Sequence, residues 1–187
     1  NVYETVQIGE QLWMAENLKV TKYKDGSDIP TGYSGSEWIN LSTGAYAVYD
    51  NNSSNADIYG NLYNWYAVDD SRGLCMEGWH VPSDDEWTIL ADYLGGSSLA
   101  GGKMKEIGTE HWLNPNTGAT NESGFTALPN GMRYPIKCVS ASDYYCELNE
   151  HGRYWTSSCC YGGGGAYGRE LRHISAALDL GNNYKTG

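Results

Sequence analysis

Glycine, asparagine and proline recur so often after residue 94 that the second half of the chain has little room for long helices. Gly adopts backbone conformations that other residues avoid, Pro lacks an amide donor, and Asn favours turns. A chain interrupted this often is predicted to form an α+β domain with an irregular antiparallel sheet, one or two helices and long loops. Clusters of these residues lie at 95–96, 101–102, 114–118 and 129–131.

One segment before these clusters is predicted to form a helix, over residues 84–94. Ser83 followed by Glu86 fits a capping box, and three carboxylates in the first turn suit the helix dipole. Gly95-Gly96 then ends the helix. The apolar residues recur at the spacing of one buried stripe and are Trp87, Leu90, Ala91 and Leu94.

Shorter patterns predict strands and turns elsewhere. Residues 2–14 alternate apolar and polar side chains around Gly9-Glu10, as in a β-hairpin. Asp25-Gly26 indicates a turn, and residues 50–55 are polar enough for a solvated loop. The other predicted strands are 125–128 and 154–158, and a late hairpin is predicted from 167–171 and 174–180.

The size and charge of the chain exclude several classes of protein. Its 187 residues suit one domain over 1–187 that buries roughly 70% of its unfolded surface without needing disulfides or metals. A net charge of −11 argues against nucleic acid and anionic membranes as partners. No apolar run is long enough for direct membrane insertion. Because the chain starts at Asn1 rather than Met, we expect that a targeting segment has been trimmed.

The last third of the chain differs from the rest in composition. Before Arg133 there are 6 basic and 18 acidic residues, net −12, and from Arg133 onward there are 6 basic and 5 acidic residues, net +1. The chain has 16 Tyr but 1 Phe, and many of the Tyr lie in this third. Tyr combines rigid contact area with a polar tip, so this composition favours a surface that contacts other molecules.

Motifs for catalysis, cofactors and metals are missing from the sequence. There is no G-x-S-x-G, P-loop or H-E-x-x-H motif, and the four His show no zinc-like spacing. We read His80 as structural, residues 162–165 as a flexible loop tip, and residues 50–61 as lacking the Gly and Glu of a calcium loop. We therefore expect no catalytic residue, no cofactor and no metal.

Five cysteines leave at least one without a partner in the chain. Cys138 and Cys146 lie eight residues apart around a predicted turn and are candidates for a disulfide. Cys75 is the candidate for the odd one out, whereas the adjacent Cys159 and Cys160 cannot easily bridge one another.

Five motifs in sequence order resemble the Fibrobacter succinogenes major paralogous domain. The most distinctive is GWHVPSDDEW (78–87), and the others are IGEQLWMAENL (8–18), YGNLYNWYAV (59–68), GATNESGFTALP (118–129) and YWTSS (154–158). The stretch 132–153 departs from the family pattern. The family's chain normally continues past 185–187 into a closing strand ending in a Cys, the implied partner of Cys75.

The resemblance implies a C-type-lectin fold of the kind found in formylglycine-generating enzymes, and a secreted or cell-surface protein of a bacterium or phage. Some family members are variable proteins of diversity-generating retroelements, in which adenine-directed mutagenesis rewrites codons near the C-terminus. Randomised Asn codons of that kind give Tyr, Ser, Gly, Asp, His, Arg and Cys, and residues 138–173 are rich in these types.

We therefore expect an extracellular ligand-binding domain whose partner is a protein or glycan, with 132–180 as the variable binding region. Trp79, Trp87 and Trp155 are expected to support the surface from the core, and for each tyrosine the alternative is a partly buried packing role. Tyrosines and arginines that lay apart or inside would contradict a single contact surface. The candidate binding residues are Tyr144, Tyr145, His151, Arg153, Tyr161, Tyr167, Arg169, Arg172 and His173.

Two alternatives remain open at this point. The first is a formylglycine-generating-type oxidase that uses Cys159 or Cys160 on a peptide substrate. The second is a structural adhesion protein whose glycan contacts depend on calcium. No motif in the sequence favours either.

Overall fold

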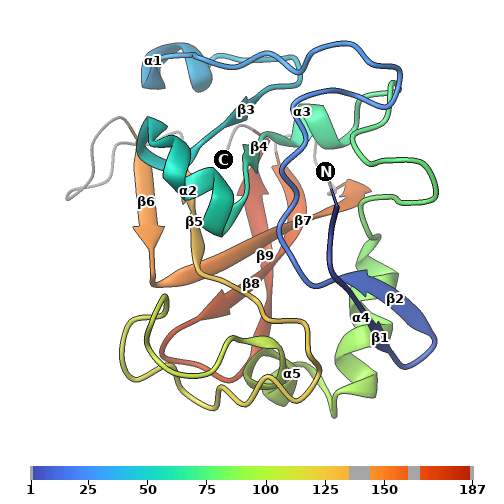
Figure 1. Cartoon of the computed structure of the whole chain (residues 1–187), viewed down its shortest axis with the longest axis vertical. Helices are drawn as coiled ribbons and strands as arrows, with labels where there is room; N and C mark the ends of the chain where they lie inside the picture. The colour runs from blue at the N-terminus through green and yellow to red at the C-terminus, as the bar shows by residue number, and fades with distance from the viewer. Residues whose placement is uncertain (1, 135–143, 160–164, 186–187) are drawn as a thin grey trace.

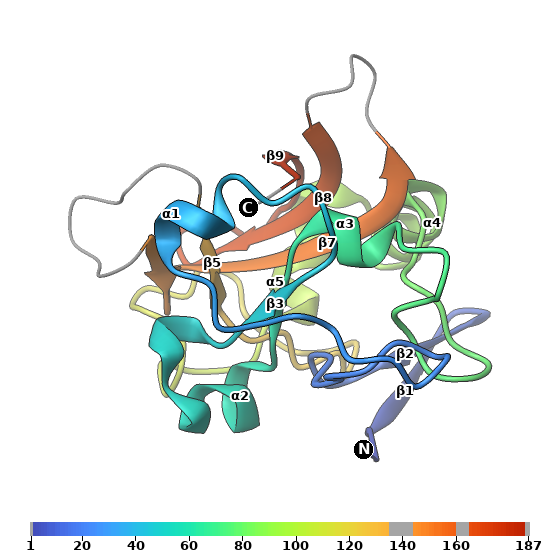
Figure 2. The same ribbon diagram turned by 90° about the horizontal axis from the view of Figure 1, so that it is seen from above.

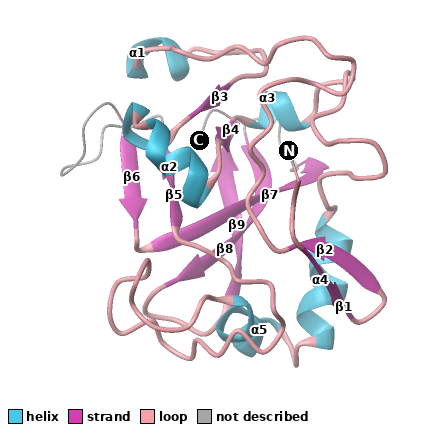
Figure 3. Ribbon diagram, viewed as in Figure 1, coloured by secondary structure: helices cyan, strands magenta, loops and turns pink. Residues whose placement is uncertain are grey.

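A computed structural model describes residues 2–134, 144–159 and 165–185. Short helices and small antiparallel sheets alternate along the chain, which confirms the predicted α+β class (Figures 1 and 3). The helices are α1 (Gly35–Trp38), the 3₁₀-helix η1 (Tyr49–Asn51), α2 (Ser53–Tyr59), α3 (Trp65–Val68), α4 (Asp84–Tyr93) and α5 (Ser97–Met104). The strands are β1 (Thr5–Ile8), β2 (Gln11–Met14), β3 (Tyr46–Ala47), β4 (Leu62–Tyr63), β5 (Asn130–Arg133), β6 (Tyr145–Leu148), β7 (His151–Cys159), β8 (Gly165–Arg172) and β9 (Leu178–Tyr184).

Helix α4 confirms the predicted helix and its capping box. The Ser83 amide donates to Glu86 Oε2 at 2.7 Å, and the Glu86 amide donates to Ser83 Oγ at 3.2 Å. These two bonds satisfy amides that the first turn would otherwise leave unpaired. The four apolar residues of the predicted stripe are all buried. Local sequence signals therefore suffice to define this helix.

Helix α5 is eight residues long and includes Gly101-Gly102, one of the clusters that argued against long helices. Both glycines lie inside the helix and are buried. A Cβ atom on Gly101 would lie 2.1 Å from the Ala177 carbonyl oxygen, and one on Gly102 would lie 2.3 Å from that of Gly118. The two glycines are thus needed because α5 packs directly against the backbone of two other segments.

Of the remaining local predictions, some are confirmed and others are wrong. The β1–β2 hairpin is confirmed, with Ile8 opposite Gln11, and so is the turn at Asp25-Gly26. Residues 50–55 are not a loop, because η1 and the start of α2 occupy them. Residues 125–128 form no strand. Ala127 makes a single parallel bridge to Lys105, and Thr126 has a φ of 55°.

The largest sheet has the order β7-β8-β9 and is antiparallel. Its β8–β9 pair confirms the predicted late hairpin, with Leu171 opposite Leu178. The β7–β8 register shifts between Trp155 and Cys159, as at a β-bulge. Beyond this shift, the end of β7 and the start of β8 stand out from the body of the molecule (Figure 2).

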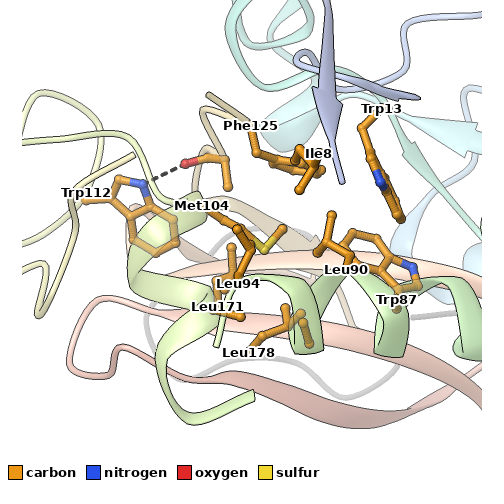
Figure 4. Packing of buried hydrophobic residues seen from close by; sticks show 13 residues of the cluster. Ile8, Trp13, Trp87, Leu90, Leu94, Met104, Trp112, Phe125, Leu171 and Leu178 are labelled. Carbon is orange, nitrogen blue, oxygen red and sulfur yellow. Dashed lines mark hydrogen bonds between the residues drawn. The ribbon is translucent and has the colours of Figure 1, made fainter. Parts of the chain in front are cut away.

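The main core joins segments that lie far apart in the sequence. Figure 4 shows Ile8 and Trp13 of the N-terminal hairpin on one side of α4, and Leu171 and Leu178 of the sheet on the other. The ring centroids of Trp13 and Trp87 are 4.8 Å apart. Residues of four of the five family-like motifs therefore meet in this core, which places β7–β9 on a packed base.

Candidate functional site

The register of the C-terminal sheet sorts the candidate binding residues onto two faces. Residues directly opposite one another share a face, and successive residues alternate. His151 pairs with Arg172, while Arg153 pairs with Glu170, which in turn faces Asp179. We call these five residues, together with Glu147 from β6, the ionic face. Leu171 and Leu178 point to the opposite face, which packs against α4 and α5.

The ionic face is held together by ion pairs between neighbouring strands. Arg153 Nη2 lies 2.7 Å from Glu147 Oε2 and 3.1 Å from Glu170 Oε1. His151 Nδ1 is hydrogen-bonded to the Glu170 carboxylate and lies 3.6 Å from Glu147 Oε2. Arg172 Nη2 lies 2.7 Å from Asp179 Oδ2. Charged side chains from β6, β7, β8 and β9 thus restrict one another's orientation.

These pairs also change the acidity of their members. Burial of Glu170 acts to raise its pKa, but the hydrogen bond with His151 and the charge of Arg153 outweigh this effect and lower the pKa. The hydrogen bond and charge of Asp179 raise the pKa of Arg172. Glu170 and Arg172 therefore stay charged at neutral pH. With histidine counted as neutral, the formal charges of the six residues sum to −1.

The prediction that Arg169 is a binding residue is wrong. It points to the α4 side of the sheet and is only 8% exposed. Its Nη2 donates to Asp84 Oδ1 at 2.7 Å, to the Asp84 carbonyl oxygen at 3.1 Å and to Thr88 Oγ1 at 3.0 Å. Arg169 is therefore a link between β8 and the first turn of α4, and its guanidinium is not on the contact surface.

Tyr145 is a second correction. It is 1% exposed, and its hydroxyl donates to Asn51 Oδ1 at 2.9 Å. Its ring lies 5.2 Å from that of Tyr49, and the guanidinium of Arg133 lies 4.9 Å from its centroid. The alternative of a packing role thus holds for Tyr145, because β5, β6 and η1 enclose its ring.

The other candidates do not join the ionic face. Tyr144 is half-buried at the start of β6 with a φ of 70°. Tyr167 is half-buried and shares the α4 side with Arg169 by register. His173 lies in the β8–β9 turn, where its Nδ1 is 3.2 Å from the Asn114 carbonyl oxygen. Tyr161 lies outside the described residues. The structure brings together His151, Arg153 and Arg172, so the prediction of one surface with all nine residues is wrong.

The backbone of β7 is attached to the rest of the domain near its register shift. The Ser157 amide donates to the Pro82 carbonyl oxygen at 2.9 Å, and the Asp84 amide donates to Ser158 Oγ at 3.0 Å. On the other side, Trp65 Nε1 donates to the Thr156 carbonyl oxygen at 3.3 Å. The motif at 78–87 thus fixes β7 as well as starting α4, a role that its sequence does not reveal.

The three tryptophans expected beneath the surface have different environments. Trp87 is buried in the main core, as predicted. Trp155 is half-buried on the side of the ionic face, and its Nε1 donates to the Tyr63 carbonyl oxygen at 2.6 Å. Trp79 is half-buried and lines a cavity.

This cavity has a volume of about 690 Å³ and extends between the N-terminal hairpin and β7. Its wall includes the free thiol of Cys75, whose pKa burial raises to about 11. The thiol is therefore protonated and weakly nucleophilic at neutral pH. Sequence reasoning did not anticipate the cavity. Its aromatic wall is formed by Trp13, Trp38, Tyr63, Trp79, Trp87, Phe125, Tyr154 and Trp155.

The remaining cysteine, metal and membrane features are as follows. Cys75 is free, as predicted, whereas Cys146 is disulfide-bonded and its predicted partner Cys138 lies outside the described residues. Cys159 has an exposed side chain, and Cys160 is not described. Within the described ranges, no three side chains of His, Cys, Asp or Glu gather as a metal site requires. In the same ranges, no helix has the length and apolar character needed to cross a bilayer.

Comparison with protein families agrees with the motifs. The family model of the Fibrobacter succinogenes major domain matches residues 6–165. This chain belongs to that family. The Fibrobacter succinogenes major domain thus spans the N-terminal hairpin, α4 and β7, up to the first residue of β8. No curated protein and no solved structure matches the chain.

Proposed function

We propose that this Fibrobacter succinogenes major domain is an extracellular ligand-binding module of receptor or adhesin type, with a C-type-lectin-like fold. Its contact surface is formed by the ionic face and by the outward residues of the β7–β8 hairpin. Its ligand is a protein or glycan. The 132–180 region belongs to the variable protein of a diversity-generating retroelement.

One observation carries this proposal. The β7–β8 hairpin is held in place by backbone atoms and by a buried side chain, and substitutions on the outer surface leave these atoms unchanged. The Pro82 and Thr156 carbonyl oxygens, the Ser157 amide and the buried Arg169 side chain make the attachments described above. Ser157 and Cys159 have exposed side chains, and Tyr167 and Arg172 are half-buried. A rigid element whose outward side chains are not needed for its position is what a display surface requires.

The chemistry of the surface suits a polar ligand. The Arg172 guanidinium presents hydrogen-bond donors to carboxylates, hydroxyls or carbonyls, and Tyr167, on the other side of β8, adds rigid contact area near the projecting end of the hairpin. Glu147 and Asp179 provide acceptors beside these donors. A surface with both signs of charge close together favours a ligand with several hydrogen-bonding groups over an apolar one.

The composition supports the same function. The near-neutral last third follows a strongly acidic part, and residues 138–173 are rich in the residue types that randomised Asn codons produce. The family resemblance links such a composition with retroelement variable proteins at the cell surface. Sequencing the gene from many cells of one population tests this part. Differences confined to adenine-bearing codons of the 132–180 region are expected, and identical copies would contradict it.

The display role is tested with two libraries expressed on yeast. The first randomises the exposed and half-buried residues Ser157, Cys159, Tyr167 and Arg172, and the second randomises the buried residues Thr156, Arg169 and Leu171. Most clones of the first library should reach the surface at wild-type levels, and few of the second should. Equal losses in both would show that the outward side chains are structural.

Ligand binding is tested with a glycan array and an array of bacterial surface proteins as probes. The wild-type domain should bind at least one probe, and Tyr167→Ala with Arg172→Ala should remove that binding while Tm stays nearly unchanged. Asp92→Ala, at an exposed position of α4, is the matched control. Binding that survives the double substitution would place the contact surface elsewhere.

A further inference from the structure

Lys105 is a buried cation that the proposed surface does not use. It follows the last residue of α5 and is 0% exposed. Its Nζ donates to three backbone carbonyl oxygens, those of Thr117 at 3.0 Å, Arg172 at 3.0 Å and Ser175 at 2.9 Å. An ammonium has three N–H donors, so this arrangement satisfies all of them.

The environment of Lys105 differs from that of an ordinary buried ion pair. Its three polar partners are neutral carbonyl groups, and the ring centroid of Trp112 lies 5.2 Å from Nζ. Burying a charge without an opposite charge costs free energy, and burial lowers the pKa of Lys105 to about 8. A neutral side chain of the same length would avoid this cost, but it could not donate three hydrogen bonds to one set of carbonyls.

The charged groups on the neighbouring elements do not bind the Lys105 ammonium in place of these carbonyl oxygens. The turn carries Arg172 and His173, and α5 carries Lys103, which is paired with Glu122 at 3.6 Å. Glu106, the next residue along the chain, is bound to His111 at 2.9 Å. The carbonyl oxygens are therefore the groups that hold the ammonium.

The three carbonyl groups come from two segments that must be joined for the ionic face to keep its shape. Thr117 belongs to the loop after Trp112, whereas Arg172 and Ser175 begin the β8–β9 turn. Two backbone bonds reinforce the junction, from the Thr117 amide to the His173 carbonyl oxygen at 2.7 Å and from the Gly102 amide to that of Ala176 at 2.8 Å. Lys105 contacts the backbone of the same Arg172 whose guanidinium pairs with Asp179.

We infer that Lys105 is a positioning residue: its ammonium fastens the β8–β9 turn to the loop at Thr117, and thereby sets the place of Arg172 on the ionic face. The link to ligand binding rests on the proposed function, whereas the fastening of the turn does not.

The first experiment uses the wild-type protein and the ¹⁵N resonance of its lysine Nζ groups in NMR. Lys105 should give an ammonium signal protected from solvent exchange, with couplings across hydrogen bonds to the carbonyl carbons of Thr117, Arg172 and Ser175. Exposed lysines such as Lys22 should exchange too fast for such couplings. A Lys105 signal that exchanges as fast as that of Lys22 would overturn the inference.

The second experiment compares Lys105→Met with Lys103→Met as the matched control. Without the ammonium, hydrogen exchange of the backbone amides of residues 172–177 should speed up by about tenfold or more, while the amides of α4 stay unchanged. Lys103→Met should leave both segments unchanged. An unchanged turn in folded Lys105→Met would overturn the inference, and if this variant does not fold, the wild-type NMR result decides.

Binding to the array probe then separates the two proposals. If both hold, Lys105→Met weakens binding of the wild-type probe by about tenfold, and Lys103→Met does not. The turn could loosen in Lys105→Met while the wild-type domain binds no probe. This result would support the fastening of the turn by Lys105 and contradict the proposed function. A loosened turn with unchanged probe affinity overturns the claim that Lys105 positions Arg172 for the ligand.

Discussion

The acidic part before Arg133 and the sheet β7–β9 use charged residues in different ways. In the acidic part, several ion pairs lie in solvent: the side chains of Lys22–Asp28 and Lys24–Glu77 are 49% to 87% exposed. On the ionic face, the paired side chains are 17% to 40% exposed and cross-link neighbouring strands. Exposed pairs contribute little to stability, whereas partly buried pairs fix geometry. The comparison shows that the net charge of a region does not reveal where its ion pairs are partly buried and fix the orientation of side chains.

The largest expected effect tests whether the acidic part of the chain supplies the free energy of unfolding of the domain. Replacing the buried Trp87 by Ala should lower the free energy of unfolding by about 3–5 kcal/mol, because it leaves a cavity between Trp13 and Tyr154. Urea denaturation measures the change. Ile89→Ala on the exposed side of the same helix should cost less than about 0.5 kcal/mol. Similar losses for both would contradict the assigned core.

The next effect concerns Lys105, which joins the two regions. Its pKa in the folded protein is about 8, below the ordinary 10.5, so the folded state releases its proton first as pH rises. The free energy of unfolding should therefore increase between pH 8 and pH 10.5, by up to about 3 kcal/mol from this group. Urea denaturation of wild type and Lys105→Met across this range isolates the contribution. Parallel pH profiles would contradict it.

A third prediction tests the connection between Asp84 in α4 and Arg169 in β8. Arg169→Ala should destabilise the protein by about 1–3 kcal/mol, because the Asp84 carboxylate loses its partner while part of it still faces solvent. A double-mutant cycle with Asp84→Ala should show that the two losses are not additive. Additive losses would mean that the pair does not couple the two regions.

A fourth prediction concerns acid. The pKa of Glu170 is lowered in the folded protein, so its contribution to stability is present above its unfolded pKa of about 4.5 and is lost as pH falls through the folded value. Glu170→Gln should make the acid limb of the stability profile less steep. Glu77→Gln, at a solvent-exposed pair, is the control and should leave that limb unchanged.

The smallest effect is expected at the surface itself. Arg172→Ala should change the free energy of unfolding by about 0–1 kcal/mol, because its ion pair with Asp179 is 35% to 40% exposed. Thermal unfolding measures this change, with Lys22→Ala as the comparison for a fully solvated pair. A loss as large as that of Arg169→Ala would mean that Arg172 is structural and would remove it from the display surface.

The sequence predicted the α+β class and much of the local structure correctly, but only part of the site. His151, Arg153 and Arg172 were predicted and do lie together. Tyr145 and Arg169 were predicted for the same surface but are buried. The prediction failed because, without the strand register, residue type does not reveal on which side of a strand a side chain lies. Glu147, Glu170 and Asp179 were missed, since carboxylates are common throughout this chain.

What the sequence determined by itself was local: the capping box of Ser83 and Glu86, the N-terminal hairpin, the turn at Asp25-Gly26 and the five ordered family motifs. Each depends on residues close together in the chain, whose hydrogen bonds and periodicity do not require a partner segment. Tertiary structure alone decided that Gly101-Gly102 lies inside a helix and that Lys105 holds three carbonyl groups. Both follow from the close approach of α5 to the loop at Thr117 and to the β8–β9 turn, which lie 12 and 67 to 70 residues from Lys105 along the chain and which no local pattern brings together.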